Sequence, residues 1–330
     1  MTTITRRDQI RQLGCAALEL LRGRMGSAQT APQRLFFKIA LGEYSFNSVY
    51  RAGDYDPVHL AEITKKEFGL SAIDYVSIFW QDKASDRSFL HELKTRAAAN
   101  GIVNHPILVD LPGPQLGDLD SEKQKAAIEA HRRWVDIGRF LDCSGIRVNL
   151  NGFDAENLGK PGRKEAVLKA SVEGYGHLLE YARQSGLDVL VQNHLGYSCD
   201  PDWLVSVMQR VNRRNAGIEA DPGHFQELFI AIKPDGRHEA RTGASFDTYA
   251  GMAKLMPYAT AVNAKTHAFD ANGNEVSFDW PRLLRIVKAG GYSGYIGIEW
   301  EPTGEGQKLS ASQGIAATKA LLERIGSEVS

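Results

Sequence analysis

Cysteine is scarce in this chain, and neither sign of charge is in excess. Three cysteines occur among 330 residues, at Cys15, Cys143 and Cys199, far apart and odd in number. This pattern fits neither a disulfide framework nor a cysteine metal site. Lysine and arginine number 39 against 40 aspartates and glutamates, for a net charge of -1. We therefore expect no nucleic-acid partner and no membrane partner.

Long apolar runs are also missing, because no stretch approaches the roughly 18 consecutive apolar residues of a spanning helix. Residues 5–8 read Thr-Arg-Arg-Asp, as in a twin-arginine export leader, but Glu19, Arg22 and Arg24 interrupt the apolar region behind them. We interpret residues 1–34 as a degenerate leader or an N-terminal extension. The expected location is cytoplasmic, with the periplasm as the alternative if the leader is functional.

From Leu35 onward, short apolar runs alternate with amphipathic segments, which is typical of successive strand-helix units around a parallel sheet. The runs are rich in Val and Ile and too continuous for strands with one wet face. The eight predicted strands are Leu35–Leu41, Ile73–Trp80, Ile102–Asp110, Ile146–Asn149, Val189–Gln192, Gly217–Asp221, Ala261–His267 and Tyr295–Trp300.

Helical patterns separate these strands, and several carry capping signals. Asp56 with Pro57 behind it is a typical helix start. Eight strands, each followed by a helix, are the number that closes a barrel, and residues 42–45 (Gly-Glu-Tyr-Ser) are not the phosphate turn of an open nucleotide-binding sheet. The predicted fold of residues 35–330 is thus an α/β protein, a (β/α)8 TIM barrel. The predicted helices include Pro57–Phe68, Ser88–Asn100, Ser121–Leu141, Trp203–Val211 and Leu283–Ala289.

One connection is long and polar, the segment Lys233–Ser245. Loops of this length in a compact domain usually have a function. We predict either a lid or a subunit contact, the latter in a homo-oligomer.

Polar side chains end four consecutive predicted strands. In a barrel the carboxyl ends of all strands meet at one rim, which is where chemistry takes place. Carboxylate, imidazole and amide oxygen ligands suit a divalent metal, with Mn²⁺ as first choice and Mg²⁺, Co²⁺ or Zn²⁺ as alternatives. Each residue alone also has a structural interpretation, as a helix cap or a hydrogen-bonded core residue. The predicted ligands are Gln192, Asp221, His267 and Glu299.

The strand-end segments resemble those of a known family. Residues 191–194 (Val-Gln-Asn-His), 221–225 (Asp-Pro-Gly-His-Phe), 264–267 (Ala-Lys-Thr-His) and 297–299 (Gly-Ile-Glu) are similar to the sugar phosphate isomerase/epimerase superfamily, the xylose isomerase-like TIM barrels. In its ketose epimerases, Glu, Asp, His and Glu hold the metal. The resemblance matches Asp221, His267 and Glu299 to the last three and His224 to a substrate-contacting histidine. Gln192 departs from the first glutamate, and an amide takes no proton at neutral pH.

Such a site supports proton abstraction next to a carbonyl, in which the metal stabilises an enediolate. Glu299 is the first candidate for the base, and His194 or His224 for the second proton transfer. Lys265 is expected to balance the oxyanion. Ordinary packing competes with substrate contact for the aromatic candidates. The predicted substrate-binding residues are Arg147, Lys265, Trp80 and Trp300, with Tyr44 as a further stacking candidate.

Three functions compete for this site. The first is an isomerase or epimerase of a sugar or keto-sugar. The second is a lyase or dehydratase that expels a β-leaving group from the same enediolate, acting on an inosose or a 3-keto-glycoside. Replacement of one glutamate by Gln192 favours the second somewhat, since elimination needs one base and one acid. The third is a non-catalytic sugar-binding barrel. An endonuclease fits worst, because phosphate-backbone binding needs a basic face.

Overall fold

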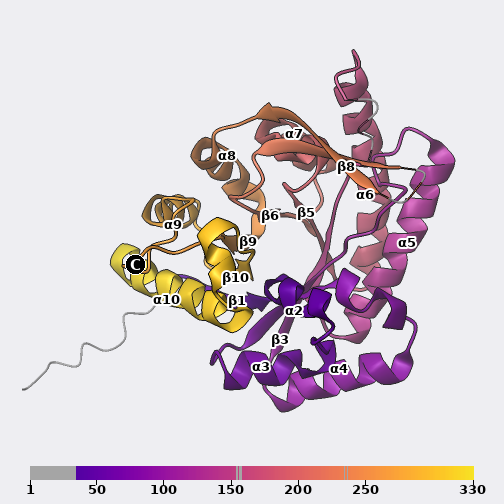
Figure 1. Ribbon diagram of the computed structural model, residues 1–330. Helices are drawn as coiled ribbons and strands as arrows, with labels where there is room; N and C mark the ends of the chain where they lie inside the picture. The colour runs from indigo at the N-terminus through magenta and orange to yellow at the C-terminus, as the bar shows by residue number, and fades with distance from the viewer. Residues whose placement is uncertain (1–34, 154, 156–157, 234, 236) are drawn as a thin grey trace, which may run out of the picture. The chain divides into compact units, whose positions relative to one another are not determined.

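Eight parallel strands close into a barrel in the computed structural model of this chain (Figure 1), which confirms the predicted fold class. The structure describes residues 35–330 except 154, 156, 157, 234 and 236, so the predicted leader lies outside the described residues. The strands follow the order β1-β10-β9-β6-β5-β4-β3-β2 around the barrel. Their bounds are β1 Lys38–Gly42, β2 Ala72–Val76, β3 Val103–Leu108, β4 Gly145–Val148, β5 Asp188–Gln192, β6 Ala216–Ala220, β9 Ala259–Thr266 and β10 Tyr295–Trp300.

Helices surround the strands (Figure 1). Aspartates start several of them: Asp86, Asp120 and Asp200 each accept hydrogen bonds from backbone N–H groups of the first turn. No helix in the described part of the chain is long and apolar enough to cross a bilayer. The helices are α2 Asn47–Ala52, α3 Leu60–Lys66, α4 Arg87–Ala99, α5 Ser121–Phe140, α6 Arg163–Gln184, α7 Pro201–Val211, α8 Thr248–Leu255, α9 Trp280–Ala289 and α10 Ala311–Val329.

Two predicted segments differ most from the observed elements. The second strand ends at Val76, four residues early, because Ser77–Phe79 form a 3-10 helix. The segment predicted as a polar loop, Lys233–Ser245, instead contains β8 (His238–Ser245), which pairs antiparallel with β7 (Gln226–Ile232) outside the barrel. Most of β8 is exposed, so its side chains carry no apolar periodicity. A role of this hairpin as a lid or a subunit contact stays a prediction.

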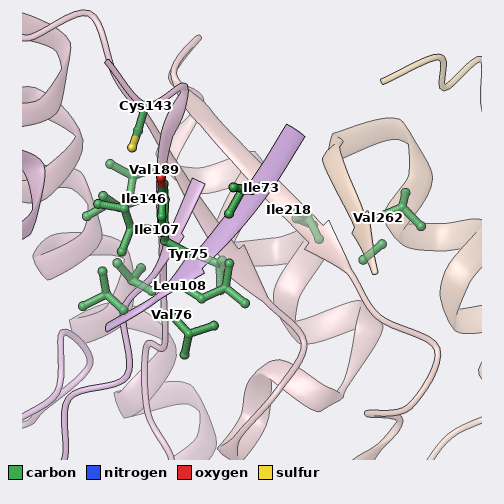
Figure 2. Close-up of a cluster of buried hydrophobic side chains, with 14 of the residues drawn as sticks. Ile73, Tyr75, Val76, Ile107, Leu108, Cys143, Ile146, Val189, Ile218 and Val262 are labelled. Carbon is green, nitrogen blue, oxygen red and sulfur yellow. The ribbon is translucent and has the colours of Figure 1, made fainter. Parts of the chain in front are cut away.

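The hydrophobic core packs against the outside of the barrel strands. Ile73, Ile107 and Ile146 are fully buried, as expected for strands covered on both faces. Figure 2 shows side chains of β2, β3, β4, β5, β6 and β9 gathered in one part of this core.

The interior of the barrel, in contrast, contains paired ionisable groups. Buried Asp74 and His105 lie 2.6 Å apart, from Oδ1 to Nδ1, and Nε of Arg147 lies 3.4 Å from Oε2 of Glu219. Gly297 makes room for one of these groups, because a Cβ there would collide with the Asp74 carboxylate. Buried charges are costly without partners. The strands therefore carry a charged inner face up to the rim where the candidate site begins.

Candidate active site

A cavity of about 330 Å³ lies at the carboxyl ends of the strands. It brings together side chains from β4, β5, β9 and β10 and from the loops that follow β5 and β6, as the barrel topology predicts. His238 of β8 also lines it, so the hairpin borders the cavity. The predicted site residues that line it are Arg147, Gln192, His194, His224, Lys265 and Glu299.

The Lys265 ammonium is surrounded by carboxylates. Its Nζ donates to Glu299 Oε1 at 2.7 Å and to Glu301 Oε2 at 3.0 Å, and it lies 3.7 Å from Asp221 Oδ2. Lys265 is only 3% exposed. Burial alone would lower the pKa of this lysine, but Glu299, Asp221 and Glu301 outweigh it and hold the pKa well above its ordinary value. Lys265 is therefore a permanent cation of the site.

Two side-chain amides complete this cluster. Gln192 Nε2 donates to Asp221 Oδ2 at 2.8 Å. Asn263 Nδ2 donates to the same oxygen at 3.1 Å and also to Glu299 Oε2. Burial raises the pKa of Asp221, an effect that Lys265 and the Gly223 and Gln192 hydrogen bonds oppose. Both amides thus present N–H groups to the carboxylates.

His267 does not join this cluster. It follows the end of β9, and its Nδ1 lies 2.7 Å from the backbone oxygen of Glu301. The backbone N–H of His267 donates to Glu275 Oε1 at 3.3 Å. The side chain of β9 that reaches both Asp221 and Glu299 is Asn263. Within the described residues, no three His, Cys, Asp or Glu side chains are placed to hold a metal ion.

The donor arrangement does not fit a divalent metal at the predicted position. An ammonium, Nζ of Lys265, already lies among the carboxylates of Asp221, Glu299 and Glu301. A divalent cation held by Asp221 and Glu299 would lie beside this like charge. The ligand set Gln192, Asp221, His267 and Glu299 stays a prediction.

Two histidines face each other in the cavity. The ring centroids of His194 and His224 are 4.5 Å apart at an interplanar angle of 77°. His194 Nδ1 lies 3.2 Å from Asn149 Oδ1, and Asn149 donates in turn to Asp110. Burial lowers the pKa of His194 to about 4 and that of His224 well below its ordinary value. Both imidazoles are therefore neutral near pH 7.

Arg147 is bound by carboxylates on two sides. Its Nη1 donates to Asp110 Oδ1 at 2.5 Å, and its Nε lies 3.4 Å from Glu219 Oε2. Burial would raise the pKa of Asp110, but Arg147 and His194 outweigh it and lower the pKa to about 2. Arg147 reaches the cavity as predicted, with its charge already compensated.

The predicted tryptophans lie in the core. Trp80 is fully buried, and its Nε1 donates to the buried carboxylate of Glu43 at 3.3 Å. Trp300 is 1% exposed and stacks on Phe269. Tyr44 does line the cavity. For both tryptophans the structure supports the packing interpretation rather than contact with substrate.

Sequence reasoning assigned no role to several residues of this site. Asn263 and Glu301 lie two residues from Lys265 and Glu299, and this spacing places them on the same face of a strand. That periodicity is the signal that could have identified them. Asp110 and Asn149 follow the buried strands β3 and β4. The hydrogen bonds that connect them to His194 form between segments far apart in sequence, so the sequence alone does not reveal them.

Comparison with solved structures finds related barrels at low identity. The IOLI protein, solved with a bound zinc atom, is 15% identical with a TM-score of 0.65, over 89% of this chain and 99% of that one. D-Allulose 3-epimerase from Methylomonas sp. is 13% identical with a TM-score of 0.63, over 88% and 99%. At such identities the likeness shows the fold.

A curated relative matches over a short segment. The C-glycoside deglycosidase alpha subunit of Arthrobacter globiformis is 47% identical over 47 residues, which are 14% of this chain and 13% of that protein. The model of the xylose isomerase-like TIM barrel family matches far more, residues 66–322. With its closed parallel barrel and its strand-end cavity, this chain belongs to the xylose isomerase-like TIM barrel family.

Proposed function

We propose that this chain is an enzyme that moves a proton next to the carbonyl of a sugar or keto-sugar, as an isomerase or epimerase. The observation that carries the proposal is the pair of neutral imidazoles, His194 and His224, in one cavity with the Lys265 ammonium. Two bases and a fixed cation are what enediolate chemistry needs.

Each histidine has a nitrogen free to accept a proton. Asn149 donates its amide N–H to Asp110, so its oxygen faces Nδ1 of His194 and accepts the N–H there. This tautomer leaves Nε2 of His194 as the basic nitrogen. Nε2 of His224 has no hydrogen-bond partner among the described residues and lies 3.6 Å from Asp221 Oδ2. In either neutral tautomer of His224 one ring nitrogen carries no proton.

Lys265 supplies the stabilising charge. When a histidine removes the proton, the C–H electron pair moves toward the carbonyl carbon and the carbonyl oxygen becomes an enediolate oxygen. An ammonium has three N–H donors, and Lys265 uses two of them on Glu299 and Glu301. The third can donate to the new oxyanion. Return of the proton to the neighbouring carbon, together with transfer of the hydroxyl proton to the former carbonyl oxygen, isomerises the sugar. Epimerisation instead needs a proton donor on the opposite face of the same carbon.

The cavity also offers an acceptor for a sugar hydroxyl. Oε1 of Gln192 is buried without a hydrogen-bond partner among the described residues, and the side chain lines the cavity. A buried unpaired acceptor is costly, so a substrate hydroxyl that donates to it would increase the affinity of the protein for that substrate.

Glu299, the base predicted from the sequence, is a weaker candidate in this arrangement. Lys265 donates to its Oε1 and Asn263 to its Oε2, so both oxygens are engaged. A divalent metal at the predicted ligand set, with Mn²⁺ as the predicted ion, remains the alternative proposal. The zinc atom in the IOLI neighbour supports a divalent metal but not Mn²⁺ in particular.

Solvent deuterium exchange tests the proposal. Ketoses, inososes and 3-keto-glycosides are incubated with the protein in D₂O, and label at carbon is measured by NMR. We expect exchange with at least one class and a loss of roughly 10²–10⁴-fold in His194→Gln and His224→Gln. His91→Gln, on the exposed face of α4, is the matched control. Wild-type exchange rates in the double histidine variant would refute the proposal.

Elimination is the second candidate function. It is favoured by the 47-residue match to the C-glycoside deglycosidase alpha subunit. The same enediolate would expel a β-leaving group. One histidine acts as the base, and the proton that it removes from carbon passes from the resulting imidazolium to the leaving oxygen. Release of a free aglycone or of water in the same assay, with no isomer formed, would select this function.

A further inference from the structure

The carboxylates at the rim need a positive charge in their midst. Asp221 is fully buried and Glu299 is 6% exposed. The amides of Gln192 and Asn263 donate to them but carry no charge. Two close buried carboxylates repel each other, so a cation has to compensate them.

Lys265 provides that cation, and the strands place it there. Its backbone pairs with Glu299 in the register of β9 and β10, which brings the ammonium and the carboxylate of Glu299 within 2.7 Å. Asn263, two residues earlier on the same face, contacts Asp221 and Glu299 directly. The ammonium is thus a built part of this site.

Gly223 leaves space for the lysine side chain. A Cβ at residue 223 would lie 2.6 Å from Cδ of Lys265 and 3.1 Å from Oδ1 of Asp221. Any larger residue would push the lysine away from the carboxylates. The loop after β6 therefore accommodates Lys265 in its observed position.

We propose that Lys265 is the resident cation of this barrel, which holds Asp221 and Glu299 in place of a divalent metal, so that the site needs no metal ion. The ammonium fills the space among the carboxylates that a metal would require. Gln192 and Asn263 turn their N–H groups, not their oxygens, toward these carboxylates. As a statement on catalysis the inference rests on the proposed function; as a statement on metal binding it stands by itself.

Metal binding by the full chain is the first test. The protein is purified without chelator, its metal content is measured by plasma mass spectrometry, and Mn²⁺ and Zn²⁺ are then titrated into it by calorimetry. We expect far less than one metal ion per chain and no saturable binding. A stoichiometric metal, either retained or bound on titration, would overturn the inference.

Removal of the ammonium is the second test. Lys265→Met keeps the length of the side chain but leaves the carboxylates uncompensated, so we expect this variant to gain affinity for Mn²⁺. Millimolar MnCl₂ should raise its melting temperature by about 2 °C or more and leave wild type unchanged. Lys265→Arg, which keeps the charge, should behave as wild type.

Lys164 offers a matched control. It also joins two carboxylates, Asp200 and Glu227, each at 2.7 Å, but away from this cluster. An equal Mn²⁺ effect in Lys164→Met would overturn the inference, since any lysine between carboxylates would then give the same result. An unchanged melting temperature of folded Lys265→Met in MnCl₂ would also contradict it. If Lys265→Met does not fold, the wild-type titration decides.

The two proposals fail in different ways. Stoichiometric metal in wild type, with exchange still lost in the histidine variants, overturns the role of Lys265 and leaves the proposed function. Absence of metal together with absence of exchange on every sugar class overturns the proposed function and leaves the role of Lys265.

Discussion

Gln192 differs by a single group from the glutamate that the family resemblance leads one to expect at this position. Its amide is buried and donates to the carboxylate of Asp221, which is itself fully buried. A glutamate there would be a second negative charge beside Asp221. An amide at residue 192 adds no negative charge. It therefore suits a site in which one monovalent ammonium, that of Lys265, balances the surrounding carboxylates.

Replacing Gln192 by Glu should destabilise the protein in metal-free buffer. The change removes a buried hydrogen bond and places like charges together, at a cost of about 1–3 kcal/mol. Urea unfolding at pH 7 with EDTA measures it. Gln81→Glu, at an exposed position, is the control and should stay near wild type. If Gln192→Glu were as stable as wild type, the local charge balance described here would be wrong.

At the scale of an element, α5 carries a buried titratable group that does not line the candidate cavity. Asp120 caps this helix. The buried face of the helix is mostly apolar but includes His131. His131 is 2% exposed, and its Nδ1 lies 2.7 Å from the carbonyl oxygen of Ala127. Burial lowers the pKa of His131 to about 4, so the helix packs with this imidazole neutral.

The pH dependence of stability should reflect this histidine. In the unfolded chain a histidine gains its proton near pH 6.5, whereas His131 in the fold stays neutral until about pH 4. His131 alone thus contributes a loss of stability of about 1.4 kcal/mol per pH unit as pH falls from 6.5 toward 4. Urea unfolding at several pH values should show a shallower slope for His131→Gln and the wild-type slope for His91→Gln. Equal slopes for wild type and His131→Gln would contradict this origin.

At the scale of the whole molecule, we expect charge to determine which of the proposed sugar substrates the cavity admits. The chain is close to neutral, and charged side chains of both signs line the cavity. Its lysine and arginine side chains within the described chain, Lys265 and Arg147, are each bonded to carboxylates. Three carboxylates line it, those of Asp110, Glu299 and Glu301. A phosphate would therefore have to compete with these carboxylates for either cation.

An uncharged sugar should therefore be preferred over its phosphate ester. For the best free sugar of the exchange panel, we expect kcat/KM at least tenfold above that of its phosphorylated form, because like charges disfavour the complex. Added salt should narrow the difference by screening. If deuterium exchange were as fast or faster with the phosphate ester, Arg147 or Lys265 would have to leave its carboxylate partner and bind the phosphate, and this expectation would be wrong.

Much of this architecture was determined by the sequence itself. Eight Val- and Ile-rich runs separated by amphipathic segments predict the barrel, because buried parallel strands leave a local record in hydrophobicity. The meeting of Gln192, His194, His224, Lys265 and Glu299 follows from strand ends sharing one rim. Strand β8 could not be predicted in this way, since most of its residues are exposed and carry little apolar periodicity.

Only the tertiary structure decided how these residues pair. Asn263, not His267, reaches Asp221 and Glu299, because inward positions alternate along β9 while His267 lies past its end. The burial of Trp80 likewise depends on packing that a linear pattern does not contain. Partner choice among charges is a property of distances between strands far apart in sequence, and the ammonium among the carboxylates exists only once the barrel has closed.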